Sequence, residues 1–128
     1  MKIKLSSIFV DDQGKALSFY TKVLGFIKKQ DFPVGEFKWL TVVSPGEPEG
    51  TELLLEPNDN AAAKTYQEAM FEQGIPLASF ATDDLQKEFE RLKKLGVDFS
   101  MEPTLMGEAT VATFKDTCGN LIQLYQVH

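Results

Sequence analysis

An internal repeat constrains the fold of this chain more than any other feature. Residues 10–26 (VDDQGKALSFYTKVLGF) and 82–97 (TDDLQKEFERLKKLGV) both run from an acidic pair through a helical pattern to Leu-Gly. The second acidic pair follows the first by 72 residues, in a chain of 128. One helix with its neighbouring strands buries only part of a sheet, so a repeat of this kind predicts two copies of one unit sharing a core.

Strand patterns surround both copies of the repeat. Alternating apolar stretches precede each helix, and three further β-rich stretches follow it, with turns predicted at 33–35, 45–50 and 119–120. We predict an α+β protein with two tandem βαβββ modules, at about 1–58 and about 75–128. A connecting helix spans about 59–74, and residues 1–128 are expected to form a single domain. The strands are expected to form a curved mixed sheet around a cavity, with the helices outside.

Helix ends are also marked in the sequence. Asp11 or Asp12 is predicted to cap the first repeat helix and Asp83 or Asp84 the second, since Asp is favoured at helix N-termini. The second helix is expected to bury one apolar stripe, and a glycine closes each helix. The stripe consists of Leu85, Phe89, Leu92 and Leu95.

Composition excludes several functions. The net charge is −6 and the pI about 4.8, and the lysines alternate with acidic residues, so the chain lacks the basic patch that nucleic-acid binding requires. No apolar run approaches the length of a membrane span, and the N-terminus resembles no signal peptide, so we expect a cytoplasmic protein. The single cysteine, Cys118, cannot form an internal disulfide and is read as a turn residue.

Two motifs connect the repeat to a known family. Residues 10–26 resemble the V-x-D-x6-FYxxxLGF signature of the vicinal oxygen chelate superfamily, and DTCGNLIQLYQ at 116–126 resembles its D-x-x-G-N-x-x-E/Q-L ending. This superfamily includes glyoxalase I, extradiol dioxygenases, and bleomycin- and fosfomycin-resistance proteins. The resemblance extends over nearly the whole chain.

The resemblance implies four positions for the ligands of a divalent metal, usually two His and two Glu. Here these positions carry Leu5, Glu56, Leu77 and Gln123. Shifting the alignment by a residue brings no His to either leucine position, and the single His, His128, ends the chain. Leucine has no lone pair, so we expect no metal cofactor, with a weak, mostly water-filled Mg or Mn site at Glu56 and Gln123 as the remaining option.

Every second side chain along a strand points to the same face of the sheet. The residues two positions away from each of these four therefore share its face. If the family's ligand positions face the cavity, the cavity is mostly apolar with a few polar groups. Trp39 is a further candidate whose face the sequence does not determine. The predicted ligand-binding residues are Leu5, Ser7, Trp39, Leu54, Glu56, Leu77, Ser79, Gln123 and Tyr125.

Two functions are considered in detail, and a third possibility, a fold kept only as an interaction module, also stays open. The first is a metal-free binding protein of the bleomycin-resistance type, which holds a small organic ligand and forms a homodimer. The second is a lyase-like or isomerase-like enzyme, with Glu56 as a catalytic base or with a weak oxygen-ligated metal. The sequence shows no nucleophile–base pair that would favour the enzyme.

Overall fold

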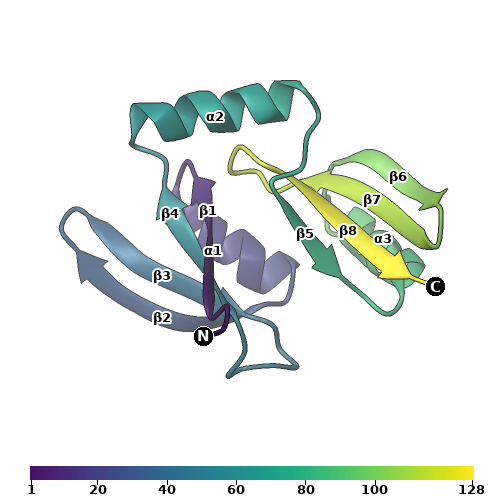
Figure 1. Cartoon of the computed structure of the whole chain (residues 1–128), viewed down its shortest axis with the longest axis horizontal. Helices are drawn as coiled ribbons and strands as arrows, with labels where there is room; N and C mark the ends of the chain where they lie inside the picture. The colour runs from purple at the N-terminus through teal and green to yellow at the C-terminus, as the bar shows by residue number, and fades with distance from the viewer. The chain divides into compact units, whose positions relative to one another are not determined.

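The computed structural model describes every residue from Met1 to His128. The chain forms two compact units, Met1–Tyr66 and Gln67–His128. Each unit contains a four-stranded mixed sheet, and the element order confirms the predicted α+β fold of two tandem βαβββ modules (Figure 1). None of the helices is long and apolar enough to span a membrane.

The first unit builds its sheet in the order β1-β4-β3-β2. Strand β1 runs parallel to β4, and the other neighbours are antiparallel. The helix follows β1 and passes from an α-helical start into one π-helical segment. The elements are β1 (Leu5–Val10), α1 (Gln13–Ser18), η1 (Phe19–Val23), β2 (Ile27–Val34), β3 (Phe37–Val43) and β4 (Glu52–Pro57).

The second unit repeats this order, with the sheet β5-β8-β7-β6 and a parallel β5–β8 pair. Helix α2 begins in the first unit and ends in the second. The elements are α2 (Ala61–Glu72), β5 (Ala78–Ala81), α3 (Leu85–Lys94), β6 (Phe99–Met106), β7 (Ala109–Lys115) and β8 (Leu121–Val127).

The predicted helix caps are confirmed, and in each acidic pair the second residue is the cap. Oδ1 of Asp12 accepts a hydrogen bond of 3.0 Å from the backbone N–H of Lys15. Oδ1 of Asp84 accepts one of 3.1 Å from the N–H of Lys87. Each bond satisfies a backbone donor that the first turn of a helix leaves without a partner.

Several predicted boundaries differ from the structure. Strand β2 continues through Pro33, so its turn lies at Gly35 rather than at 33–35. Leu95 was expected in the buried stripe of α3, but its side chain is 54% exposed, because the helix ends at Lys94 and the backbone leaves the helical path. The other three members of that stripe face inward.

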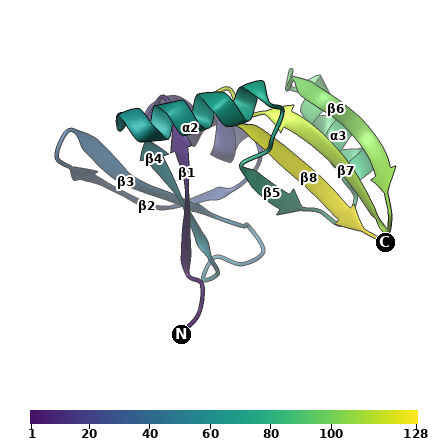
Figure 2. The same ribbon diagram turned by 45° about the horizontal axis from the view of Figure 1, so that its top comes forward.

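In the first unit, α1 lies against β3 and β4 (Figures 1 and 2). Alternation and register divide the sheet into two faces. The face toward α1 carries apolar side chains that are at most 4% exposed, so it forms the core of this unit together with Ala16 and Tyr20. These side chains are Ile8, Val10, Leu40, Val42 and Leu55.

In the second unit, three aromatic rings connect α3 to its sheet. The ring of Phe89 meets that of Phe99 edge-on at 4.7 Å, and Phe99 lies 5.7 Å from Phe114. Phe114 is paired with Ile122 across β7 and β8. Both are buried, so this face of the sheet is the core of the unit.

The loop between β7 and β8 is held by a buried polar network that includes a side chain of α2. The carboxylate of Asp116 accepts hydrogen bonds from the backbone N–H groups of Cys118 and Asn120 and from the Asn120 side chain, at 2.8–3.0 Å. The amide of Gln67 donates to the Cys118 backbone oxygen and to Asn120 Oδ1, both at 3.0 Å. The Asp and Asn of the second family motif therefore shape this loop.

Candidate functional site

The predicted site residues of the first unit all lie on the face of its sheet opposite α1. Pairing of β1 with β4 sets Ser7 beside Leu54 and Phe9 beside Glu56. Leu5, at the start of β1, pairs with Glu52 and is 44% exposed. This face therefore combines apolar side chains with two carboxylates.

Trp39 also belongs to the face opposite α1, which the sequence alone did not determine. It lies two residues before Thr41 on β3, and Thr41 pairs with Leu54 on that face. The Trp39 ring stacks on Phe32 of β2, with ring centres 6.4 Å apart and planes at 20°. Phe32 is 46% exposed, so the two rings form an accessible aromatic surface.

A hydrogen-bonded trio occupies the centre of the same face, and sequence analysis did not identify it. Oε1 of Glu52 accepts hydrogen bonds from Nε2 of Gln30 at 2.6 Å and from the hydroxyl of Thr41 at 2.7 Å. The backbone N–H of Gln30 donates to the Thr41 hydroxyl at 3.1 Å. The hydrogen bonds from Gln30 and Thr41 hold the pKa of the Glu52 carboxyl below its ordinary value of 4.5, so this group is a carboxylate at neutral pH.

A β-bulge is the reason that Gln30 reaches this trio. The pairing of β2 with β3 shifts between Lys28 and Gln30, so Lys28 pairs with Val42 and Gln30 with Thr41. Val42 and Thr41 point to opposite faces, and the bulge therefore turns Gln30 to the face opposite α1. Strand alternation read from the sequence assumes no bulge and places Gln30 on the same face as Lys28.

Glu56 is half-buried at the end of β4, on the same strand and the same face as Glu52. Its carboxylate makes no hydrogen bond and no ion pair within the chain. Its roles as a ligand contact and, in the alternative reading, as a catalytic base stay predictions.

In the second unit the predicted site residues share the face opposite α3. Ser79 pairs with Gln123, and its hydroxyl donates a hydrogen bond of 2.9 Å to Gln123 Oε1. Tyr125 is half-buried two residues further along β8. Leu77 lies just before β5, where its N–H donates to the backbone oxygen of Leu121 at 3.0 Å.

The donor set at the family's metal positions does not fit a transition-metal site. In the first unit these positions offer Leu5 and one carboxylate, Glu56; in the second they offer Leu77 and the amide of Gln123. No three His, Cys, Asp or Glu side chains gather anywhere in the chain in a way that could hold a metal ion. A tight Zn or Ni site needs three or four nitrogen, sulfur or carboxylate donors.

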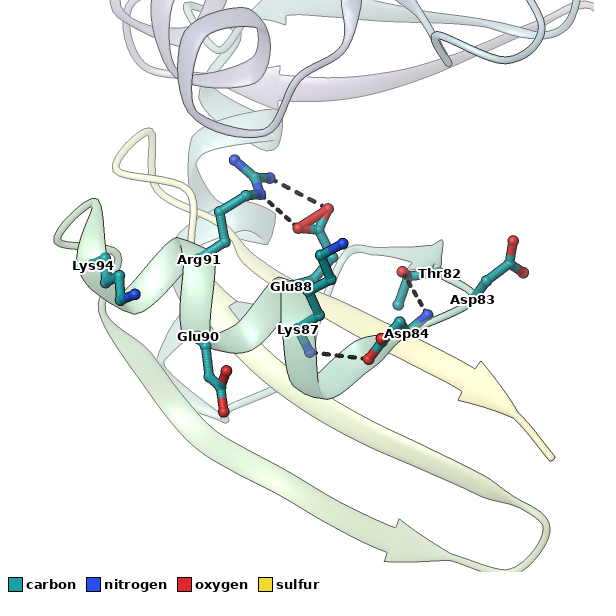
Figure 3. Close-up of a pocket in the computed structure, with 8 residues that line it drawn as sticks. All are labelled: Thr82, Asp83, Asp84, Lys87, Glu88, Glu90, Arg91 and Lys94. Atoms are coloured by element: carbon teal, nitrogen blue, oxygen red, sulfur yellow. Dashed lines mark hydrogen bonds and ion pairs between the residues drawn. The ribbon is translucent and has the colours of Figure 1, made fainter.

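An open groove of about 670 Å³ follows the outer side of α3 and the turn before it (Figure 3). Several of its charged side chains already have partners within the chain. Arg91 donates a hydrogen bond of 2.6 Å to Glu88, and Asp84 caps the helix. The groove has no apolar lining residue, so we regard it as the solvated face of α3. Its lining residues are Thr82, Asp83, Asp84, Lys87, Glu88, Glu90, Arg91 and Lys94.

Known proteins resemble this chain over nearly its whole length. The uncharacterized protein YurT of Bacillus subtilis (strain 168) is 60% identical over 98% of this chain and 99% of its own. Among solved structures, UcmS2 is 31% identical with a TM-score of 0.84, covering 98% of this chain and 97% of that one. TnmS3, described as an antibiotic binding protein from Streptomyces sp. CB03234, is 27% identical with a TM-score of 0.77, covering 100% and 97%.

The family model extends over both repeats. It matches residues 2–124, which include the first motif, residues 116–124 of the second motif and eight of the nine predicted ligand-binding positions. The ninth position, Tyr125, follows directly after the match. The chain therefore belongs to the Glyoxalase/Bleomycin resistance protein/Dioxygenase superfamily.

Proposed function

We propose that this protein binds a small organic ligand without a metal ion, on the sheet face opposite α1 in the first unit or on the face opposite α3 in the second. The observation that carries the proposal is the replacement of the family's usual imidazole ligands by Leu5 and Leu77. In the first unit, the leucine shares its face with the stacked pair Trp39 and Phe32. An apolar surface with a few placed polar groups is typical of a small-molecule site.

Similarity to solved proteins supports the same class of function. TnmS3, which resembles this chain along its whole length, is described as an antibiotic binding protein. This description supports sequestration or sensing of a small organic molecule as the function proposed for this chain. The ligand of this chain need not be the same, because the side chains on these faces decide which molecule fits.

A thermal-shift screen tests the proposal directly. Protein that has been dialysed against a chelator is heated with a panel of aromatic antibiotics and aromatic metabolites. A ligand present at about 100 times its dissociation constant adds about 2.7 kcal/mol to the free energy of unfolding, which raises the melting temperature by several degrees. If no compound shifts the melting temperature, the proposal loses its support.

Variants then locate the ligand. Trp39→Ala tests the face opposite α1, and Gln123→Ala tests the face opposite α3. The matched control is Leu95→Ala, which removes an exposed apolar side chain at the end of α3. Either test variant is expected to weaken binding about tenfold or more, while the control binds like the wild type. Equal binding by all three would contradict the placement.

An enzymatic function is the second candidate, and one observation favours it. The half-buried Glu56 carboxylate has no hydrogen-bond or ionic partner, which leaves it available to take a proton from a bound substrate. Incubating each ligand from the screen with the protein and following it by mass spectrometry or NMR tests for turnover. Turnover that Glu56→Gln abolishes, with binding retained, would replace the binding-only proposal.

The homodimer expected from the sequence is a proposal as well. Val34 and Phe37 form an apolar pair at the end of the face opposite α1, and they are 53% and 38% exposed, so a second copy that covers them would bury apolar surface. Light scattering after size-exclusion chromatography is expected to give twice the chain mass of 14.3 kDa. A monomer mass at micromolar concentration would contradict this.

A further inference from the structure

The carboxylate of Glu52 is fixed in orientation, but only one of its two oxygens accepts hydrogen bonds from the chain. Both of its hydrogen bonds, from Gln30 and Thr41, go to Oε1. Oε2 accepts no hydrogen bond from the chain. Because two donors fix Oε1, the position of Oε2 is fixed as well, and an acceptor oxygen is preorganised on this sheet face.

Two lysines act electrostatically on Glu52, but neither forms an ion pair with its carboxylate. Lys4 and Lys29 both lower the pKa of Glu52 through space. Their amino groups, however, bind elsewhere: Lys4 donates to the backbone oxygens of Glu49 and Gly50, and Lys29 to that of Pro48 and to the Glu49 carboxylate. The negative charge on Glu52 is therefore available to a ligand.

The chain around Glu52 departs from regular strand structure in a way that an ordinary surface glutamate does not require. The bulge at Lys28 and Gln30 departs from regular pairing, and its effect is to bring the Gln30 amide to Glu52. Thr41, which is fully buried, uses its hydroxyl on the same carboxylate oxygen. Bulges that redirect a side chain are common beside binding and active sites.

Aromatic surface lies on the same strands. Trp39 precedes Thr41 by two residues on β3, and Phe32 follows Gln30 by two on β2. The stacked rings thus lie two residue pairs along the sheet from the two donors that hold Glu52, which makes them the next pair on the same face. A ring face attracts both another aromatic ring and a cation.

We propose that Glu52 is the charged anchor of the ligand site and that the ligand is an organic cation, an aromatic molecule carrying a protonated amine. This inference rests on the proposed binding function and specifies its ligand class. The amine donates a charge-assisted hydrogen bond to Oε2 of Glu52, and the aromatic part of the ligand packs on Trp39 and Phe32. The net charge of −6 adds a long-range attraction for cations.

Three indoles that share one ring system and differ in charge test the inference. Tryptamine is a cation at neutral pH, tryptophol is its neutral hydroxyl counterpart, and indole-3-acetate is an anion. Dissociation constants are measured by NMR titration of the full chain at pH 7. We expect tryptamine to bind about tenfold tighter than tryptophol or more, and indole-3-acetate to bind weakest.

The matched variants are Glu52→Gln and Glu36→Gln. Glu52→Gln keeps an oxygen for Gln30 and Thr41 but removes the charge, and it is expected to bring tryptamine and tryptophol to within about twofold. Glu36→Gln removes the same charge from the exposed β2–β3 turn and is expected to keep the tenfold preference. An unfolded Glu52→Gln would be recognised by its NMR spectrum. Gln30→Ala then serves as the milder change, because it removes one of the two donors that fix the Glu52 carboxylate without adding charge, and it is expected to reduce the preference for tryptamine.

Three results would overturn the inference. Equal affinity of the wild type for tryptamine and tryptophol refutes the cation preference, while the proposed binding function stands on any ligand found in the wider screen. A tryptamine preference that survives Glu52→Gln removes Glu52 as the anchor. Absence of binding by all three indoles also refutes this ligand class, and the antibiotic screen then decides the proposed function separately.

Discussion

Nε2 of Gln67 lies 2.8 Å from the point that a β-carbon on Gly119 would occupy. Gly119 has a φ of +99°, and the Gln67 amide is held by hydrogen bonds to Cys118 and Asn120. A side chain at 119 would therefore meet a group that cannot move without losing buried hydrogen bonds. The glycine of the second family motif is required by this contact as well as by its backbone conformation.

Gly119→Ala is expected to destabilise the fold more than Gly25→Ala. Gly25 has a similar φ of +92° and open space around its Cα, so its substitution costs about 1–2 kcal/mol from backbone strain alone. Gly119→Ala is expected to cost about 1–3 kcal/mol more, because it disrupts buried hydrogen bonds. Urea denaturation of both variants measures the difference. Equal losses of unfolding free energy in the two variants would show that the Gln67 side chain can move aside at no cost in stability.

The Glu52 carboxylate predicts a pH dependence of stability. Hydrogen bonds from Gln30 and Thr41 lower the pKa of Glu52 in the folded state below the ordinary 4.5 of the unfolded chain. The unfolded state then binds more protons, so this contribution is complete above about pH 5 and is lost as the pH falls through the folded pKa. The free energy of unfolding of the wild type should fall toward that of Glu52→Gln as acid is added. A difference between the two that stays constant from pH 7 to pH 3 would refute the assignment.

The acidic pair before α3 predicts unequal effects of two adjacent substitutions. Asp84 accepts the capping hydrogen bond from the N–H of Lys87, whereas the Asp83 side chain caps nothing. Asp84→Ala is therefore expected to cost about 0.5–2 kcal/mol, and Asp83→Ala much less. Thermal denaturation of both variants is the check. A larger loss for Asp83→Ala would show that the helix begins one residue earlier.

Truncation to alanine should lower the free energy of unfolding much more at Leu92, in α3, than at Leu95, just beyond the end of that helix. Leu92 is 2% exposed in the core of the second unit, and Leu95 is 54% exposed beyond the end of the helix. Leu92→Ala is expected to cost about 2–5 kcal/mol, because it leaves a cavity. Leu95→Ala should stay within about 0.5 kcal/mol of the wild type. Similar losses for both would mean that Leu95 is covered in solution.

Patterns of hydrophobicity and helix-end residues were sufficient to predict the elements. Strand β8 runs over Leu121–Val127, directly after the turn predicted at 119–120, because a stretch rich in apolar residues follows Gly119 and Asn120 without a break. The caps at Asp12 and Asp84 followed from the preference of Asp for helix N-termini. Strand β2 continues through Pro33 because Pro33 pairs with Lys38 of β3, and the preference of proline for turns does not reveal this pairing.

The site was less predictable than the fold, for a physical reason. Side-chain parity can be counted from the sequence only along an unbroken strand, and a bulge reverses it. The bulge before Gln30 conceals the trio with Thr41 and Glu52, although Glu52 lies two residues before Leu54 on the same strand and therefore on the same face. The face of Trp39 became clear only from the pairing of β3 with β4.

The central claim is that the protein binds its ligand without a metal ion, and one paired measurement tests it most directly. Metal content is determined by mass spectrometry on the purified protein, and ligand affinity is measured before and after exhaustive chelation. The account predicts far less than one Zn, Ni or Fe per chain and the same affinity in both preparations. One equivalent of such a metal per chain, with affinity lost on chelation and restored by the metal, would contradict it.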